Sequence, residues 1–425
     1  MGFYDRIKRL LKDDFNRNFA TLFSGSVIAQ IIPLLASILL ARIYGPAEFG
    51  VLAIFTSIVM IFSSVVNLRY EFAIPLAKDD NEAVTVVLLS GLVAIILSAL
   101  LTLIFLLFQQ SILALIGGEE LGNWLFLVPL ALLLSGIYNC LNYFSIRFKK
   151  YRVIAKSNIV RSSSNAGLQM ALGLLYAKFP SLLIGYVVSL LFGNSQMLKG
   201  FWRHKEVIKR VTIAEIKGAA FRFRKFPLIS IWGIFLNNLS VNINNFFISR
   251  FFGPIQLGLY SYSYRYINAP LSLISSNMGQ LFYQVCADKA KSGEKVDKEF
   301  IATLKKLLII CIPLFLVLYF IIEELFAFAF GEEWRMAGTY AKILIPLFFI
   351  RTVFGPVSLI NAAFEKQVLA LGMQFLIFFV NISILFYTFY NKITILDFLH
   401  LYTTCGILVY IVLVFVCYLV ASRKI

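Results

Sequence analysis

Long apolar segments alternate with short polar ones along the chain, and about twelve of the apolar segments are long enough to cross a lipid bilayer. A helix needs ~20 mostly apolar residues to span the hydrocarbon layer. Such segments are expected near residues 19–41, 47–67, 83–108, 123–146, 157–176, 181–199, 227–249, 256–286, 303–322, 338–363, 368–390 and 396–420. The pattern predicts an all-α polytopic membrane protein with about twelve transmembrane helices.

The turn that follows the first apolar segment returns in the second half of the chain. RIYGPAEFG begins at Arg42 and RFFGPIQLG begins at Arg250, and a Gly-Pro pair stands at the same place in each copy. Gly-Pro ends one helix and permits a sharp turn into the next. One Gly-Pro alone is only a common helix terminator, so it is the duplication that indicates two related halves.

The order of these segments predicts four parts of the chain. They are an amphipathic inner-surface segment at 1–18, an N-terminal six-helix bundle at 19–200, a basic cytoplasmic linker at 201–226 and a C-terminal six-helix bundle at 227–425. The first segment mixes apolar with basic residues at helical spacing, which is typical of a helix that lies on a membrane surface.

Composition and charge agree with a membrane location. The chain is 60% hydrophobic and only 14% charged, more apolar surface than a soluble core can bury. The net charge is +17, and most of the 39 Lys and Arg residues fall on one side when the amino terminus is placed in the cytoplasm. That asymmetry follows the positive-inside rule. It predicts a bacterial cytoplasmic (inner) membrane protein with both termini cytoplasmic, whose basic clusters meet membrane phospholipids rather than nucleic acid.

Candidate chemistry for an enzyme is sparse. The five cysteines are scattered through the apolar segments, and the two histidines are far apart in the sequence, so neither a metal site nor a histidine-based triad is expected. No cofactor is expected either. The outer loops are short, the longest being predicted around Glu323 to Gly338, which leaves little room for a substrate-binding loop of a polymerase or glycosyltransferase. The chain is therefore not expected to be an enzyme.

Polar residues inside three of the segments recur every three or four positions, which places them on one helical face. The three sets are Ser26, Gln30, Pro33 and Ser37, then Asn238, Asn242, Asn245 and Ser249, and then Arg265, Asn268, Ser272 and Ser275. Such faces avoid lipid and turn toward other helices or water. Polar side chains that only join helices to each other are the alternative explanation.

Two arginines lie too deep in their segments to reach the membrane surface easily. Arg265 is about 14 Å of helix from the start of its segment, and Arg351 is deeper still. No carboxylate occurs at comparable depth, and a buried cation without a partner is costly. The arginines therefore predict a water-filled cavity of positive potential that holds an anion. Arg161 is shallower and can also snorkel to the surface.

The alternative for the deep arginines is pairing with carboxylates at the membrane edges. Glu71, Glu323 and Glu324 are the candidates, and a tilted helix would permit the contact.

Four motifs resemble one family. They are LFSGSVIAQIIPLLASILLARIYGPAEFGVLAIF at 22–55, LRYEFAIPLAKDD at 68–80, GPIQLGLYSYSYR at 253–265 and FGEEWRMAGTYAKIL at 330–344. The chain is similar to polysaccharide transporters of the Wzx O-antigen flippase type, in the multidrug/oligosaccharidyl-lipid/polysaccharide exporter superfamily. The resemblance implies two six-helix bundles, related by a pseudo-twofold axis, around a central cavity of alternating access. It implies an undecaprenyl-diphosphate-linked oligosaccharide as substrate, for O-antigen or capsule, and a polysaccharide polymerase as a candidate partner.

The resemblance also bears on individual residues. Arg69 and Arg265 match positions where peptidoglycan-precursor flippases carry arginine, whereas Gln30 and Ser37 stand where those flippases have a basic residue in the first span. The expected substrate-binding residues are Arg265, Arg351, Arg161, Arg69, Gln30, Asn242, Asn245 and Asn268, and Arg42 and Arg250 are expected to form an outer gate. The alternatives are a multidrug antiporter or a peptidoglycan-precursor flippase of the same fold, and, in another class, a membrane polysaccharide polymerase or glycosyltransferase.

Overall fold

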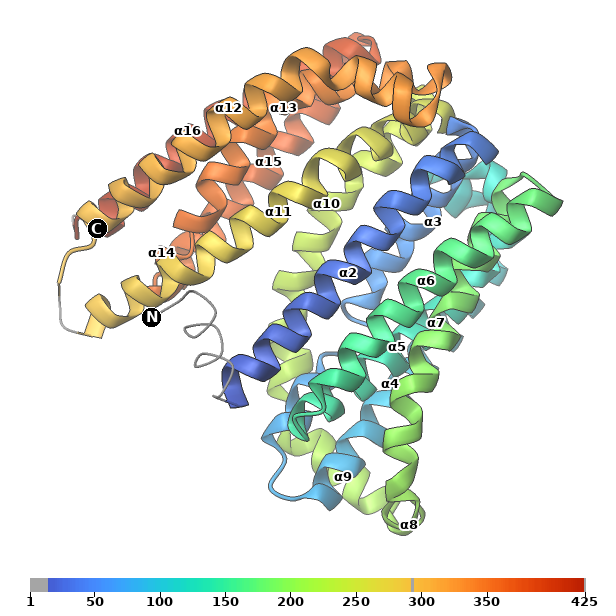
Figure 1. Cartoon of the computed structure of the whole chain (residues 1–425). Coiled ribbons are helices and arrows are strands. Elements are labelled where there is room, and N and C mark those ends of the chain that lie inside the picture. The colour runs from blue at the N-terminus through green and yellow to red at the C-terminus, as the bar shows by residue number, and fades with distance from the viewer. Residues whose placement is uncertain (1–13, 292–293, 424–425) are drawn as a thin grey trace, which may run out of the picture. The chain divides into compact units, whose positions relative to one another are not determined.

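Helices account for every regular element in the computed structural model, which describes residues 14–291 and 294–423 (Figure 1). The helices up to Phe252 are α2 (Asp14–Ile43), α3 (Pro46–Ser63), α4 (Asp80–Ile116), α5 (Leu127–Arg147), α6 (Tyr151–Leu175), α7 (Phe179–Phe201), α8 (Lys205–Arg210), α9 (Ile213–Arg222) and α10 (Ile231–Phe252). Four short helical turns join them: η1 (Tyr70–Leu76), η2 (Glu119–Phe126), η3 (Trp202–His204) and η4 (Phe226–Ser230). Most of the predicted surface segment 1–18 lies outside the described residues.

The later part of the chain has the same character. It consists of α11 (Pro254–Lys291), α12 (Asp297–Phe330), the short turn η5 (Glu332–Trp334), α13 (Arg335–Val357), α14 (Ile360–Ala363), α15 (Gln367–Asn391) and α16 (Ile395–Ala421). The predicted outer loop from Glu323 to Gly338 is wrong, because α12 continues to Phe330 and only Gly331 separates it from η5. Ion pairs of Glu324 with Arg335 and of Glu323 with Lys342 compensate the charges there.

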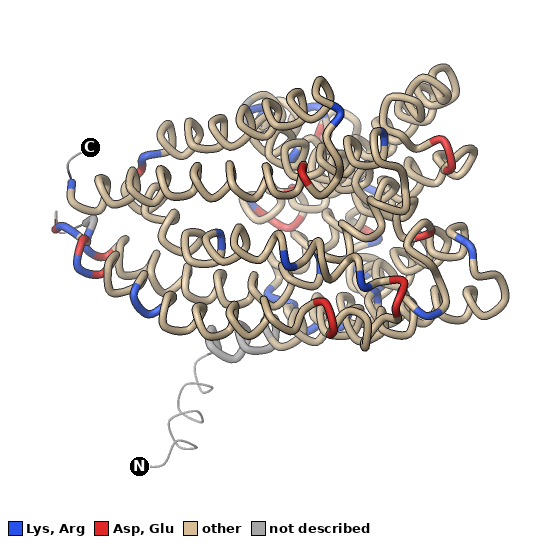
Figure 2. The backbone as a smooth tube through the Cα atoms, turned by 90° about the horizontal axis from the view of Figure 1, so that it is seen from above, with Lys and Arg blue, Asp and Glu red and all other residues tan. Residues whose placement is uncertain are grey.

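Nine helices within the described residues are long and apolar enough to cross a membrane. The other three predicted spans are helices as well, namely α6, α10 and α11, of 25, 22 and 38 residues. They are more polar because they carry arginine, serine and asparagine residues along their length. Figure 2 shows that long runs of the helical backbone carry neither Lys and Arg nor Asp and Glu. The chain is thus an all-helical, multi-pass membrane protein.

Contacts divide the chain into two compact units, one up to Arg250 and one from Phe251 onward. In the first unit α6 packs against α2 and α7, and α5 packs against α4 and α7. In the second unit α13 packs against α11, α12 and α16. The boundary between the units lies after most of α10, whereas the sequence pattern predicts the second bundle from residue 227. The division into two six-helix bundles stays a prediction.

Polar contacts explain why α10 belongs to the first unit. Asn245 donates a hydrogen bond from Nδ2 to Ser57 Oγ on α3 at 2.8 Å. Ser249 Oγ donates to the Gly117 carbonyl at 2.5 Å, and Arg250 Nη1 lies 3.6 Å from Glu119 Oε1. Gly117 has φ +62°, which favours glycine, and its missing side chain lets the backbone of α10 approach closely. The end of α10 is therefore docked on the turn between α4 and η2.

One turn is repeated between the two halves with nearly the same backbone. Lys149 before α6 has φ +52° and Glu365 before α15 has φ +56°. The next residue donates its amide over the same span in each case, from Lys150 to Ser145 O and from Lys366 to Asn361 O, both at 2.8 Å. The helices that follow, α6 and α15, are both 25 residues long. This match supports the internal duplication that the sequence motif predicts, although the two Gly-Pro copies themselves differ in backbone at the glycine.

Candidate functional site

A pocket of about 340 Å³ inside the first unit brings together two of the arginines that the sequence singles out, Arg69 and Arg161. The pocket is lined by the end of α3, the start of η1 and side chains of α5, α6 and α7. Its lining residues are Val59, Met60, Ser63, Ser64, Arg69, Glu71, Phe72, Ser135, Tyr138, Asn139, Tyr143, Arg161 and Tyr186. Two cations, one carboxylate and several hydroxyl and amide groups thus surround one cavity.

Arg69 is held in place by its backbone and by an aromatic ring. Leu68 and Arg69 have φ values of +48° and +66°, so two successive residues adopt the left-handed conformation that non-glycine residues rarely take. The guanidinium carbon lies 3.6 Å from the centre of the Phe72 ring, a cation–π contact. Arg69 Nη1 lies 3.9 Å from Glu71 Oε1. The strained turn therefore aims the cation at a fixed place in the pocket wall.

Asn67 fixes this turn to the neighbouring helices. It is 1% exposed, and its Nδ2 lies within hydrogen-bond distance of Ser90 O at 3.1 Å and Gly136 O at 3.2 Å. Its Oδ1 accepts a hydrogen bond from Asn139 Nδ2 at 3.2 Å. One side chain thereby ties the turn before η1 to α4 and α5.

We expect Asn67→Ala to lower the thermal unfolding midpoint of the purified protein, corresponding to about 1–3 kcal/mol, because it leaves buried carbonyl groups without a donor. Asn81→Ala is the matched control, since Asn81 is exposed at the start of α4. Equal midpoints for the two variants, measured in the same detergent, would show that Asn67 does not hold the turn.

Burial dominates the electrostatics of Arg69 and Glu71, which lie outside the spanning helices. It lowers the pKa of the Arg69 guanidinium, and the nearby Glu71 charge opposes that shift. It raises the pKa of the Glu71 carboxyl to about 7, against a backbone hydrogen bond and the Arg69 charge. The carboxyl is 3% exposed, and its Oε2 has no hydrogen-bond partner among the described residues. At neutral pH the pair therefore carries less negative charge than two ordinary side chains would, and the pocket stays cationic.

Arg161 reaches the same pocket from α6. Its guanidinium carbon lies 5.5 Å from the centre of the Tyr138 ring. The stem of Arg161 packs against Gly193 of α7, where an added Cβ would lie 3.1 Å from the Arg161 Cβ. Among the described residues no carboxylate lies within ion-pair distance of Arg161. Its charge is therefore available to an anion in the pocket.

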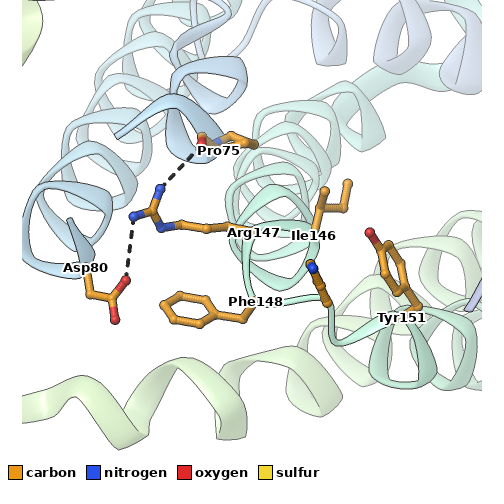
Figure 3. A pocket seen from close by; sticks show the side chains of 7 residues that line it. Pro75, Asp80, Ile146, Arg147, Phe148 and Tyr151 are labelled. Carbon is orange, nitrogen blue, oxygen red and sulfur yellow. Dashed lines mark hydrogen bonds and ion pairs between the residues drawn. The ribbon is translucent and has the colours of Figure 1, made fainter. Parts of the chain in front are cut away.

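A second pocket, of about 460 Å³, lies at the start of α6 (Figure 3). Arg147 dominates it, but its cation is already engaged by the protein. Arg147 Nη1 donates to Ala77 O at 2.8 Å and Pro75 O at 3.3 Å, and Nη2 lies 3.6 Å from Asp80 Oδ1. Arg147 therefore acts as a tie between α5 and the segment after η1, and this pocket is the weaker candidate for an anion.

The second unit places its deep arginine beside phenol and benzene rings. Arg351 Nη1 donates to Tyr264 Oη at 3.0 Å, and the guanidinium carbon lies 5.8 Å from the Tyr264 ring centre and 5.6 Å from that of Phe348. Arg265 is exposed on α11. The pairing of Arg351 and Arg265 with edge carboxylates is wrong within this unit, because Glu323 pairs with Lys342 and Glu324 with Arg335.

The remaining predicted site residues do not line either pocket described above. Gln30 is exposed on α2 and Asn268 is half-buried on α11. Asn242 is buried and donates to Asn238 O in its own helix at 2.8 Å, while Asn245 joins α10 to α3. Arg42 and Arg250 are both exposed, and Arg250 pairs with Glu119.

Several pocket residues were not singled out from the sequence. Ser135, Tyr138, Asn139 and Tyr143 all lie on α5, at intervals of three, one and four residues. This spacing puts them on one helical face, the same signal that the first, seventh and eighth predicted spans give. The polar face of α5 is therefore readable from the sequence, whereas its meeting with Arg69 is not.

The fold is shared with solved transporter structures. An inward-facing multidrug resistance MATE family transporter of the MOP superfamily aligns with 95% of this chain and 98% of its own, with a TM-score of 0.71 and 14% identity. The lipid II flippase MurJ, in an inward closed conformation, aligns with 95% of this chain and 87% of its own, with a TM-score of 0.68 and 14% identity. The chain is a multi-pass membrane protein with the fold of MOP-superfamily transporters.

Sequence relatives narrow this class to one family. The profile of the polysaccharide biosynthesis protein family matches residues 39–338, and the chain belongs to that family. An "uncharacterized membrane protein in cps region" of Klebsiella pneumoniae is 23% identical over 384 residues, which are 89% of this chain and 76% of that relative. The family and fold that the sequence motifs predict are thereby confirmed.

Proposed function

We propose that the protein is a flippase that moves an undecaprenyl-diphosphate-linked oligosaccharide from the cytoplasmic to the outer leaflet by alternating access, for surface polysaccharide such as O-antigen or capsule. The glycan and diphosphate cross through a cationic cavity while the prenyl tail stays in lipid. Membership of a polysaccharide biosynthesis family and a transporter fold support this proposal. A polysaccharide polymerase is the partner expected to consume the product.

The observation that carries the proposal is the pocket shared by Arg69 and Arg161. Arginine guanidinium groups bind phosphate oxygens through charge-assisted hydrogen bonds. Tyrosine, asparagine and serine side chains around them can hydrogen-bond to sugar hydroxyls. The pocket holds two cations against a single, largely buried carboxylate, so it favours anions over the cations that a cationic-drug antiporter would carry.

The wider proposal includes twelve spans in two six-helix bundles around a central cavity, with α6, α10 and α11 completing the nine apolar helices. Arg351, Arg265, Gln30, Asn242, Asn245 and Asn268 stay proposed substrate-binding residues, and Arg42 and Arg250 stay the proposed outer gate. An inside-negative potential favours outward movement of each negative charge by ~2.3 kcal/mol per 100 mV. A diphosphate would thus be driven outward by the potential.

Reconstituted vesicles provide the test. Lipid-linked oligosaccharide extracted from cells that lack this protein is placed in vesicles with the full chain, and its exposure to an outside enzyme is followed with and without a membrane potential. We expect potential-stimulated flipping of the diphosphate-linked glycan and none of phosphatidylglycerol, whose head group also carries phosphate. Equal flipping of both lipids would contradict a specific flippase. Normal flipping in deletion cells that only fail to extend the glycan would indicate a polymerase.

Arg351→Ala and Arg265→Ala should each reduce this flipping about tenfold, because each removes a cation that meets the diphosphate. Lys305→Ala serves as the control, since Lys305 is exposed on α12. If both arginine variants flip the lipid at the wild-type rate and at wild-type abundance, these residues lie outside the substrate path.

A further inference from the structure

The carboxyl group of Glu71 is the one acidic group in the wall of the pocket that holds Arg69 and Arg161. The side chain is almost fully buried, yet one oxygen, Oε2, has no hydrogen-bond partner among the described residues, and the same is true of Arg69 Nε. The Arg69 to Glu71 contact of 3.9 Å is longer than a hydrogen bond. The pair is therefore incomplete on both sides, and each member has capacity for another partner.

The groups that face Glu71 leave it without a second fixed cation. The turn η1 packs against α4, α5 and η4. The titratable or charged groups on these elements, on the turn itself and around the pocket are Arg69, Tyr70, Asp80, Glu82, Tyr138, Cys140, Tyr143, Arg147, Arg161 and Tyr186. Asp80 and Glu82 are paired with Arg147 and Arg222, and η4 contributes no titratable residue. The two cations that share the pocket with Glu71 are Arg69 and Arg161.

An anion in the pocket would compete directly with this carboxylate. Two negative groups around one guanidinium in a buried site repel each other, and the repulsion is relieved when one of them takes a proton. An oxyanion with more negative charge than a carboxylate is the better partner for the arginines. The carboxylate is then the group that becomes neutral, and its unpartnered Oε2 is the atom free to receive the proton.

We propose that Glu71 takes up a proton when an oxyanion of the phosphate type binds to Arg69 and Arg161, so that proton and anion are loaded together. This inference rests on the anion-binding role in the proposed function. The proton comes from bulk water and is held on the Glu71 carboxyl as a neutral acid. The anion replaces the carboxylate as counter-ion of Arg69, and no bond other than the O–H bond is formed.

Thermodynamic linkage makes the effect reciprocal. If the anion favours protonated Glu71, acid pH must favour the anion by the same factor. Burial already raises the pKa of Glu71 to about 7, so the change falls in an accessible range. Anion affinity should rise as the pH falls from 8 to 6, by about tenfold for each unit by which the bound anion raises the pKa of Glu71.

Calorimetry with inorganic sulfate tests the inference on the purified full chain, because sulfate keeps its charge between pH 6 and 8. Titrations in two buffers of different ionisation enthalpy give the protons taken up per anion. For the wild type we expect roughly half a proton per sulfate near pH 7 and about tenfold tighter binding at pH 6 than at pH 8. Glu71→Gln, which mimics the neutral acid, should take up no proton and bind equally at both pH values.

Glu206→Gln is the matched control, because Glu206 is an exposed carboxylate on α8 and its loss should leave proton uptake unchanged. Sulfate binding without proton uptake in the wild type, or uptake that persists in Glu71→Gln, overturns the inference while leaving the anion pocket and the flippase proposal intact. If sulfate does not bind, or binds as well to Arg161→Ala, the anion pocket itself is wrong and the inference falls with it. The wild-type measurement alone is decisive if the variant folds poorly.

Discussion

Arg161→Ala is expected to reduce flipping of the lipid-linked oligosaccharide by about 10- to 100-fold while the protein keeps its abundance and thermal stability. A charge-assisted hydrogen bond to phosphate contributes about 1.5–3 kcal/mol, which is the source of that factor. Stability should change little, because no described carboxylate lies within ion-pair distance of Arg161 and only its contact with the Tyr138 ring is lost. The measurement is the rate of flipping in reconstituted vesicles at limiting substrate.

Arg152→Ala is the matched control for Arg161→Ala. Arg152 lies on the same helix, α6, but is exposed and does not line the pocket. The control variant should flip at nearly the wild-type rate. Wild-type flipping by Arg161→Ala would mean that the pocket is not part of the substrate path. An equal loss in both variants would instead indicate a general effect of charge on α6.

Arg69 is a less clean probe than Arg161, for a physical reason. Removing Arg69 leaves the buried Glu71 carboxylate without its nearest cation, which destabilises the protein as well as the site. Any loss of transport in Arg69→Ala would then combine two causes. A comparison of the paired change, Arg69→Ala with Glu71→Gln, against Glu71→Gln alone separates the contribution of the cation.

The sequence predicts the helices well and their polarity less well. The apolar segments give α2 to α7 and α12 to α16 within a few residues, because lipid requires long uninterrupted helices. The predicted spans at 157–176, 227–249 and 256–286 form the helices α6, α10 and α11, but their polar residues keep them outside the nine apolar helices. Polarity within a span is therefore a sign of an interior position rather than evidence against a helix.

The site shows where sequence reasoning ends. The depth of Arg351 is readable from its position, but its hydrogen bond to Tyr264 depends on how α11 and α13 pack. Asn242 and Asn245 follow the expected helical spacing, and yet they bond to Asn238 and Ser57 within the first unit. Spacing identifies a polar face, while tertiary packing decides whether that face joins helices or lines a pocket.

Gly117→Ala is expected to cost about 2–4 kcal/mol of stability by displacing the docked end of α10. A Cβ at Gly117 would lie 2.7 Å from the Ser249 carbonyl carbon and closer still to the backbone of Arg250, which cannot yield without moving the helix. The left-handed φ of +62° adds a further cost for any residue with a side chain. The measurement is the thermal unfolding midpoint in detergent, compared with Gly91→Ala, where open space surrounds the glycine.

A double-mutant comparison separates docking from backbone strain. Gly122 also has a positive φ, of +48°, but nothing surrounds its missing side chain, so Gly122→Ala carries strain alone. Ser249→Ala removes the hydrogen bond to Gly117 O. Its cost should vanish in the Gly117→Ala background, since α10 is already displaced there, and persist in the Gly122→Ala background. If Ser249→Ala costs the same in both, α10 stays docked despite the added methyl group, and its release cannot be the step by which the proposed gate at Arg250 opens.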